Sequence, residues 1–159
     1  MKTWFHMKAG EAADEIDIFD EIGVWGVTAK DFISDLRALK RPEITLSINS
    51  PGGSVFDGIA MYNALRNSGK KVTCRVLGVA ASAASFVAMA GDTVQMSPQS
   101  MMMIHDAMGI TMGNADDHRR QVAITCRSSR GILRAMMRPS VGSDSQTDFR
   151  ITLQPPPAR

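Results

Sequence analysis

The sequence predicts an α/β domain built on a largely parallel sheet. Short apolar strands alternate with helical segments along residues 1–121, and this rhythm is typical of parallel sheets with flanking helices. The length of 159 residues suffices for one sizeable core. Hydrophobic residues make up 44% of the chain and charged residues 21%, as in ordinary globular proteins.

Two strands and two helices open the predicted domain. A strand is expected at Glu15–Phe19, where apolar and acidic residues alternate. Thr28 is a suitable N-cap for a helix over Ala29–Leu39, in which apolar residues recur at helical spacing. A second strand at Ile44–Ile48 ends at an Asn-Ser-Pro-Gly-Gly turn, and a helix over Asp57–Asn67 follows.

Three further strands and one helix complete the predicted sheet. A strand at Val72–Leu77 ends at a turn on Gly78, and an Ala-rich helix is expected over Ala81–Ala90. Two short strands follow at Thr93–Met96 and Met101–His105. In such folds the loops that leave the carboxyl ends of the strands build the functional site. Those loops comprise residues 49–53, residues 78–82 and the surroundings of position 105.

The C-terminal part of the chain has a different composition. Residues 1–118 hold ten Lys/Arg and fourteen Asp/Glu, a net charge of −4, whereas residues 119–159 hold eight Arg and two Asp, a net charge of +6. From Ile124 onward no apolar periodicity is sustained, and the Arg, Ser and Pro content favours irregular structure. We therefore predict a domain over residues 1–121 and a divergent or disordered tail over residues 122–159.

Several classes of function are disfavoured by composition. A net charge of +2 is too small to indicate nucleic acid or an anionic membrane as a partner. The longest apolar stretch, Val76–Ala90, is too short to cross a bilayer, and the N-terminus becomes acidic before any signal-peptide-like run. Cys74 and Cys126 lack metal-ligand spacing, so neither a metal site nor a disulfide framework is expected, and a reducing cytoplasm is indicated.

Three segments carry residues suited to nucleophilic catalysis. Ser82 lies at a strand-to-helix turn, where a helix N-terminus offers unpaired N–H groups. His105 ends an apolar strand, and the Gly-Gly pair ending at Gly53 can turn backbone N–H groups toward an oxyanion. Each also has a structural interpretation: a helix N-cap, a structural histidine and a simple turn. His6 and His118 lie in polar contexts and are weaker candidates for a base.

Jointly, three motifs resemble the Clp protease proteolytic subunit (ClpP) family of serine peptidases. They are ITLSINSPGGSVFDGIAMYNAL, GVAASAASFVAMAG and MMMIHDAMG, in that order. The resemblance covers about residues 14–121 and is greatest toward the shorter ClpP-related proteins of prophages and phage head-maturation operons. It implies a ClpP/crotonase-like fold with a projecting handle, and a serine endopeptidase that uses no metal or cofactor.

The resemblance also implies roles for individual residues. Ser82 matches the nucleophile and His105 the general base. Gly53 and Ala83 match the residues whose N–H groups hold the oxyanion. Residues Gly109–Asn114 fall where the family places its handle, and the handle helix is expected to begin at the next residue.

No triad acid is assigned from the sequence. The family's acid lies in an acidic helical segment beyond the handle helix, and no segment here matches it. Asp144 and Asp148 lie in a Ser/Thr-rich stretch, and Asp106 is adjacent to the base rather than behind it.

Three functions remain open at this point. The first is a cytoplasmic, ring-forming endopeptidase that cleaves protein or peptide substrates through an acyl-enzyme, either with a Clp-type ATPase or on phage capsid or scaffold protein. The second is a non-peptidase of the same broader fold, such as an acyl-CoA hydratase or isomerase, which the pairing of Ser82 with His105 disfavours. The third is a catalytically impaired or inactive remnant that only assembles.

Overall fold

A computed structural model describes residues 7–9, 13–136 and 151–153 of the chain. Its helices and strands alternate as the sequence predicts. In chain order they are β1 (Met7–Ala9), β2 (Asp14–Ile18), α1 (Ala29–Ala38), β3 (Glu43–Ser50), α2 (Val55–Arg66), β4 (Lys71–Ala81), α3 (Ala83–Ala88), β5 (Thr93–Met96), β6 (Met101–Met103), α4 (Ala115–Met136) and β7 (Ile151–Leu153).

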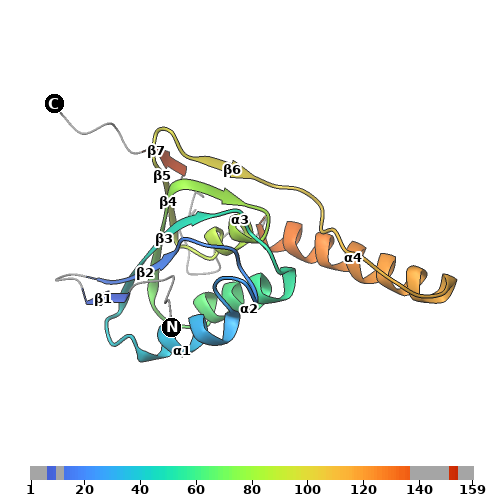
Figure 1. The fold of residues 1–159 in the computed structure, drawn as a ribbon. Coiled ribbons are helices and arrows are strands. Elements are labelled where there is room, and N and C mark those ends of the chain that lie inside the picture. The colour runs from blue at the N-terminus through green and yellow to red at the C-terminus, as the bar shows by residue number, and fades with distance from the viewer. Residues whose placement is uncertain (1–6, 10–12, 137–150, 154–159) are drawn as a thin grey trace.

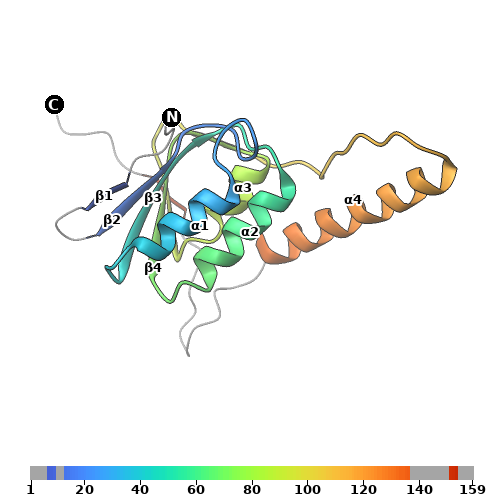
Figure 2. The ribbon, with the colours of Figure 1, turned by 60° about the horizontal axis from the view of Figure 1, so that its bottom comes forward.

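The strands form one sheet in the order β1-β2-β3-β4-β5-β7, and β6 pairs with β4 outside this path. The pair β1–β2 is antiparallel, and the other pairs in the described residues are parallel. Figures 1 and 2 show α1, α2 and α3 together on one face of the sheet. The predicted α/β class with a largely parallel sheet is therefore confirmed.

The hydrophobic core fills the space between this sheet face and the three helices. Ile16 of β2, Leu46 of β3 and Val76 of β4 are fully buried. Phe32 of α1 and Met61 of α2 pack against them from the helical side. Burial of an apolar side chain of this size stabilises the fold by roughly 1.5–3 kcal/mol. The core thus fixes the carboxyl ends of the parallel strands, where the loops 49–53 and 81–83 meet.

The first two helices each begin at a side-chain cap, and a separate hydrogen bond joins their starts. The hydroxyl of Thr28 accepts the N–H of Asp31 at 3.2 Å, and the hydroxyl of Ser54 accepts the N–H of Asp57 at 3.2 Å. The carboxylate of Asp57 in turn accepts the N–H of Ala29 at 2.9 Å, so the starts of α1 and α2 are tied together. Because Ser54 follows the Gly-Gly pair directly, this network anchors the loop at residues 50–54.

Strand β4 differs from its prediction because it does not end at Gly78. It pairs with β5 over Thr73–Val76 and then with β6 over Val79–Ala81. Between these stretches its register with β3 shifts, and the side chain of Asn49 accepts the N–H of Val79 at 3.2 Å. A Cβ on Gly78 would lie 2.4 Å from that Asn49 oxygen, so glycine allows the irregularity inside a continuing strand. The following helix, α3, is correspondingly shorter than expected.

Helix α4 forms the projecting handle. The chain leaves the body after β6, and α4 returns toward the body, as both views show (Figures 1 and 2). The helix begins at Ala115, as predicted for a handle helix. The side-chain oxygen of Asn114 accepts the N–H groups of Asp116 and Asp117 at 2.9 and 3.1 Å, which caps this end.

The sequence predicts no regular structure beyond Ile124, and here the structure differs, because α4 continues to Met136. Along its length the helix makes few apolar contacts: Val122 and Ile124 are 62% and 45% exposed. The helix is nevertheless amphipathic, and it was missed because its composition is polar on average, with Arg and Ser residues spread through it. The predicted boundary between residues 121 and 122 falls inside α4, and the division into domain and tail stays a prediction. Residues 137–150 and 154–159 of the predicted tail lie outside the described residues.

Candidate active site

Ser82 occupies the turn between β4 and α3 in a conformation that serine rarely adopts. Its backbone has φ +53° and ψ −122°, and no other described non-glycine residue has a positive φ. The N–H of Ser82 donates to the carbonyl of Met103 at 2.8 Å, which ties this turn to β6. Strained backbone at a strand-to-helix turn is a common way to present a nucleophile above a sheet.

The side chain of Ser82 does not cap the helix. It makes no capping hydrogen bond to α3, and its Oγ lies 2.8 Å from Nε2 of His105. His105 lies two residues past the end of β6, so the β4–β6 pairing brings the two side chains together across 23 positions of sequence. Ser82 therefore occupies the N-cap position of α3, but its side chain bonds to His105 and does not cap the helix. Ser85, the next serine, is buried and donates its hydroxyl to the carbonyl of Ser82 at 2.6 Å.

The Gly-Gly loop lies against the same turn. A Cβ on Gly52 would lie 2.4 Å from the carbonyl oxygen of Ala81 and 2.8 Å from the nitrogen of Ala83, so only glycine permits this approach. The carbonyl of Gly52 and the N–H of Ser54 both bond to Ile22, each at 2.7 Å. In such a parallel bridge the N–H of the residue between them points to the opposite side of the chain.

That residue is Gly53, whose φ is +141°. Its N–H is therefore turned away from Ile22, and no hydrogen bond to another described residue occupies it. Ala83 is the first residue of α3, and the N–H groups of a first helical turn have no partner within the helix. Two N–H donors thus remain in the loops that border Ser82, as an oxyanion hole requires.

Apolar side chains surround the Ser82–His105 pair. Among the described residues, no aspartate or glutamate lines the small cavity beside the pair. Its lining residues are Val55, Ser82, Ala83, Ser85, Phe86, Ile104, His105, Ala107 and Ile132. Ile132 comes from the last part of α4, so the handle helix closes one side of the site. Sequence reasoning missed this contribution, because the stretch that holds Ile132 was predicted to belong to an irregular tail.

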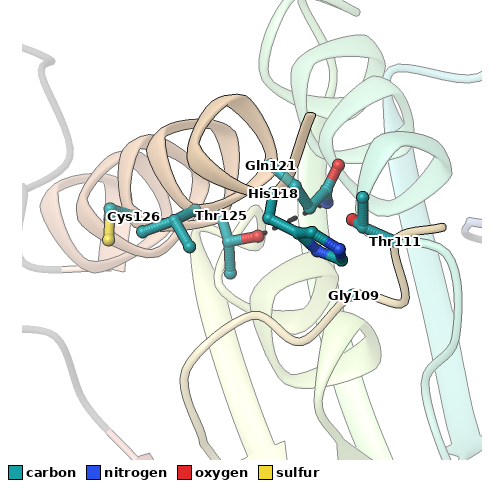
Figure 3. A pocket seen from close by; sticks show the side chains of 7 residues that line it. Gly109, Thr111, His118, Gln121, Thr125 and Cys126 are labelled. Carbon is teal, nitrogen blue, oxygen red and sulfur yellow. Dashed lines mark hydrogen bonds between the residues drawn. The ribbon is translucent and has the colours of Figure 1, made fainter. Parts of the chain in front are cut away.

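His118 lies elsewhere, in a separate pocket of about 310 Å³ between the handle loop and α4. Figure 3 shows its ring beside Gly109 and Thr111, with a hydrogen bond between Gln121 and Thr125 behind it. This pocket shares no lining residue with the cavity at Ser82. Of the two histidines that the structure describes with their side chains, only His105 contacts the serine. His6, the remaining weak candidate, lies outside the described residues.

No carboxylate in the stretch 13–136 forms an ion pair or a hydrogen bond with His105. Asp106 contributes its main chain rather than its side chain, because its carbonyl oxygen lies 2.6 Å from Nδ1 of His105. Asp144 and Asp148 lie outside the described residues. The catalytic roles of Ser82, His105, Gly53 and Ala83 therefore stay predictions, with the geometry described above.

Two further properties concern binding and location. Among residues 13–136, no group of three or more His, Cys, Asp or Glu side chains is arranged to hold a metal ion. Cys74 and Cys126 are both free, the first buried and the second exposed. Within the described part of the chain, no helix combines the length and the apolar character needed to span a membrane.

Comparison with known proteins gives one consistent family. Residues 8–147 match the family described as Clp protease. An ATP-dependent Clp protease proteolytic subunit of Bacteroides thetaiotaomicron is 35% identical over 109 residues, which cover 67% of this chain and 47% of that protein. Another, from Bacteroides fragilis strain ATCC 25285, is 32% identical over 124 residues, covering 70% and 58%. One from Pleurastrum terricola is 38% identical over 89 residues, covering 54% and 45%. The chain spans about half the length of these curated relatives.

Proposed function

This chain belongs to the Clp protease family, and on that premise we propose that it is a serine-type endopeptidase that cleaves peptide bonds through an acyl-enzyme. One observation carries the proposal: the Oγ of Ser82 lies 2.8 Å from Nε2 of His105. This is the distance at which a base can accept a hydroxyl proton, on a serine that is presented by a strained turn.

In the proposed reaction, Oγ of Ser82 attacks the scissile carbonyl while Nε2 of His105 takes its proton. The carbonyl oxygen becomes an oxyanion, which accepts hydrogen bonds from the N–H groups of Gly53 and Ala83. His105 then gives the proton to the leaving amine, and the acyl-enzyme remains on Ser82. A water molecule, deprotonated by the same histidine, releases the acyl group and regenerates the serine.

The described residues that line the cavity, which include Ser82 and His105 and no carboxylate, support a peptidase over an acyl-CoA hydratase or isomerase. Those enzymes would need acidic side chains at the reacting carbon, whereas the described lining of the cavity offers the hydroxyls of Ser82 and Ser85, one imidazole and apolar surface.

A fluorophosphonate probe tests the assignment, because it phosphonylates only serines that a base activates. We expect it to label the wild-type protein on the peptide that contains Ser82, and to label Ser85→Ala on the same peptide. Ser82→Ala and His105→Gln are expected to remain unlabelled. Ser85→Ala is the matched control, because it removes a hydroxyl from the same helix. Labelling of Ser82→Ala at any other serine would refute the proposal.

We further propose that the chain assembles into rings and acts on protein or peptide substrates. The handle supports this, because Met108, Ile110 and Met112 are 80%, 97% and 94% exposed, and such a patch is suited to burial against another copy. Light scattering after size exclusion is expected to give a multimer. A Clp-type ATPase partner and phage capsid or scaffold processing, the two settings that the sequence resemblance implies, are proposed as the alternatives for its cellular role.

An inactive subunit that only assembles is the second candidate, and one observation favours it. Within residues 13–136, no acidic side chain supports His105. Fluorophosphonate labelling distinguishes the two candidates. An inactive subunit would form the same multimer but would not react with the probe.

A further inference from the structure

The hydrogen bonds of His105 determine which of its nitrogens carries the proton. Nδ1 lies 2.6 Å from the carbonyl oxygen of Asp106. A carbonyl oxygen can only accept a hydrogen bond, so Nδ1 must be the donor. In the neutral imidazole the proton is then on Nδ1, and the lone pair of Nε2 faces the Ser82 hydroxyl at 2.8 Å. This is the tautomer that a general base for Ser82 requires, and the third member of a triad normally imposes it.

The orientation of this carbonyl is in turn fixed from α4. The carbonyl of Asp106 and the N–H of Ala107 belong to one planar trans peptide group, so they point in opposite directions. The N–H of Ala107 donates to the hydroxyl of Ser129 at 3.0 Å. Ser129 therefore holds one side of the peptide group while His105 is bonded to the other.

We propose that the main-chain carbonyl of Asp106 orients His105, a task for which residues 13–136 provide no acidic side chain, and that Ser129 is the residue that positions this carbonyl. The inference rests on the proposed peptidase function and identifies what holds its base. It also gives α4 a role. The hydrogen bond from Ala107 to Ser129, 22 residues further along the chain, sets the direction of the carbonyl that orients the imidazole of His105.

The carbonyl performs one of the two tasks of an acid. It fixes the tautomer, but it carries only a partial charge and stabilises the imidazolium less than a carboxylate does. In the worked serine-protease example, replacing the acid by an amide lowers kcat about 10⁴-fold because the amide imposes the wrong tautomer. A carbonyl cannot impose that tautomer, so turnover should lie above this limit and below that of a full triad.

Three variants of the full-length protein test the role of Ser129. Ser129→Ala is expected to lower kcat on a fluorogenic peptide roughly 10- to 100-fold, the usual cost of removing an orienting partner, with KM unchanged. Ser129→Thr keeps a hydroxyl and should recover most of the rate. Ser128→Ala, the same change one position earlier on α4, should match the wild type. Equal rates for Ser129→Ala and Ser128→Ala would overturn the role of Ser129.

A second measurement reads the tautomer without turnover. Nitrogen NMR of ¹⁵N-histidine-labelled protein at about pH 9, with His105 assigned by comparison with His105→Gln, should show the proton on Nδ1. In Ser129→Ala the signal should move toward the Nε2-protonated form. An Nε2 proton in the wild type would overturn the inference, as would a loss of turnover in Asp144→Ala or Asp148→Ala comparable with that in Ser82→Ala.

The two proposals fail in different ways. If the fluorophosphonate does not label Ser82 while the proton of His105 is on Nδ1, the peptidase proposal fails and the role of the carbonyl stands. If Ser82 is labelled but neither the tautomer nor the rate responds to Ser129→Ala, the peptidase proposal stands and the role of Ser129 fails.

Discussion

The backbone strain at Ser82 can be measured by comparing two substitutions at the same position. Ser82→Ala and Ser82→Gly both remove the hydroxyl and its hydrogen bond to His105. They differ in the Cβ alone, which alanine keeps and glycine lacks. Since Ser82 has φ +53° and ψ −122°, the Cβ is what makes this conformation costly. The difference in stability between the two variants therefore reports the strain.

The expected difference follows from two opposing effects. A non-glycine residue held in a sparsely populated backbone region costs about 1–3 kcal/mol, and glycine relieves that cost. Glycine also gives the unfolded chain more freedom, which costs roughly 0.5–1 kcal/mol relative to alanine. The net prediction is that Ser82→Gly is more stable than Ser82→Ala by about 1 kcal/mol, which corresponds to roughly 2–4 °C in Tm for a chain of this size.

Urea and thermal unfolding, followed by circular dichroism at one protein concentration, measure this difference. A fixed concentration is needed because self-association would itself shift Tm. Both variants should fail to react with a fluorophosphonate. The reasoning would be refuted if Ser82→Ala proved equal to or more stable than Ser82→Gly, because the turn would then carry no strain.

Three further predictions concern close packing, reactivity and the core. Gly52→Ala should abolish fluorophosphonate labelling of Ser82, because its Cβ would lie 2.4 Å from the carbonyl oxygen of Ala81; retained labelling would show that the loop can move away. Burial raises the pKa of Cys74 to about 12, so its thiol stays protonated and shielded at pH 8. Iodoacetamide and mass spectrometry should therefore find exposed Cys126 alkylated and Cys74 intact in native protein, and alkylation of both would contradict the burial. Met61→Ala should lower the free energy of unfolding by about 2–5 kcal/mol in urea titration, since Met61 is fully buried, and a change below about 1 kcal/mol would argue against this core.

Sequence patterns predicted the central part of the fold well, because burial there is periodic. The strands at Glu43–Ser50 and Thr93–Met96 and the helices α1 and α2 lie within a few residues of their predicted ranges. Their inward side chains pack against one core, so the apolar spacing reports their structure directly. The predicted meeting of the three loops is likewise found, and it brings Ser82 and His105 within hydrogen-bonding distance.

The remaining features depend on contacts that have no periodic signature. Strand β4 passes through Gly78 because the side chain of Asn49 bonds to the next residue, and glycine there suggested a turn instead. Helix α4 is an exception, because it is amphipathic, but its polar average composition and its Arg and Ser content suggested irregular structure instead. Ser129 acts through a single hydrogen bond to a main-chain N–H, and the carbonyl of Asp106 belongs to the backbone of every sequence. Neither could be found from residue types alone.

Strand β4 changes its pairing partner along its length, so two parts of the molecule can open at different free energies. The first part of the strand is held in the core between β3 and β5, whereas its last residues hold the three-residue strand β6. Met101 and Met103 are exposed and only Met102 of β6 packs against the core, so detaching β6 uncovers one apolar side chain and requires less free energy than global unfolding. Ser82 follows β4 and His105 follows β6, and the same opening separates them. The Ser82–His105 hydrogen bond therefore has a stability of its own, lower than that of the fold, and on warming it should be lost while the core is still intact.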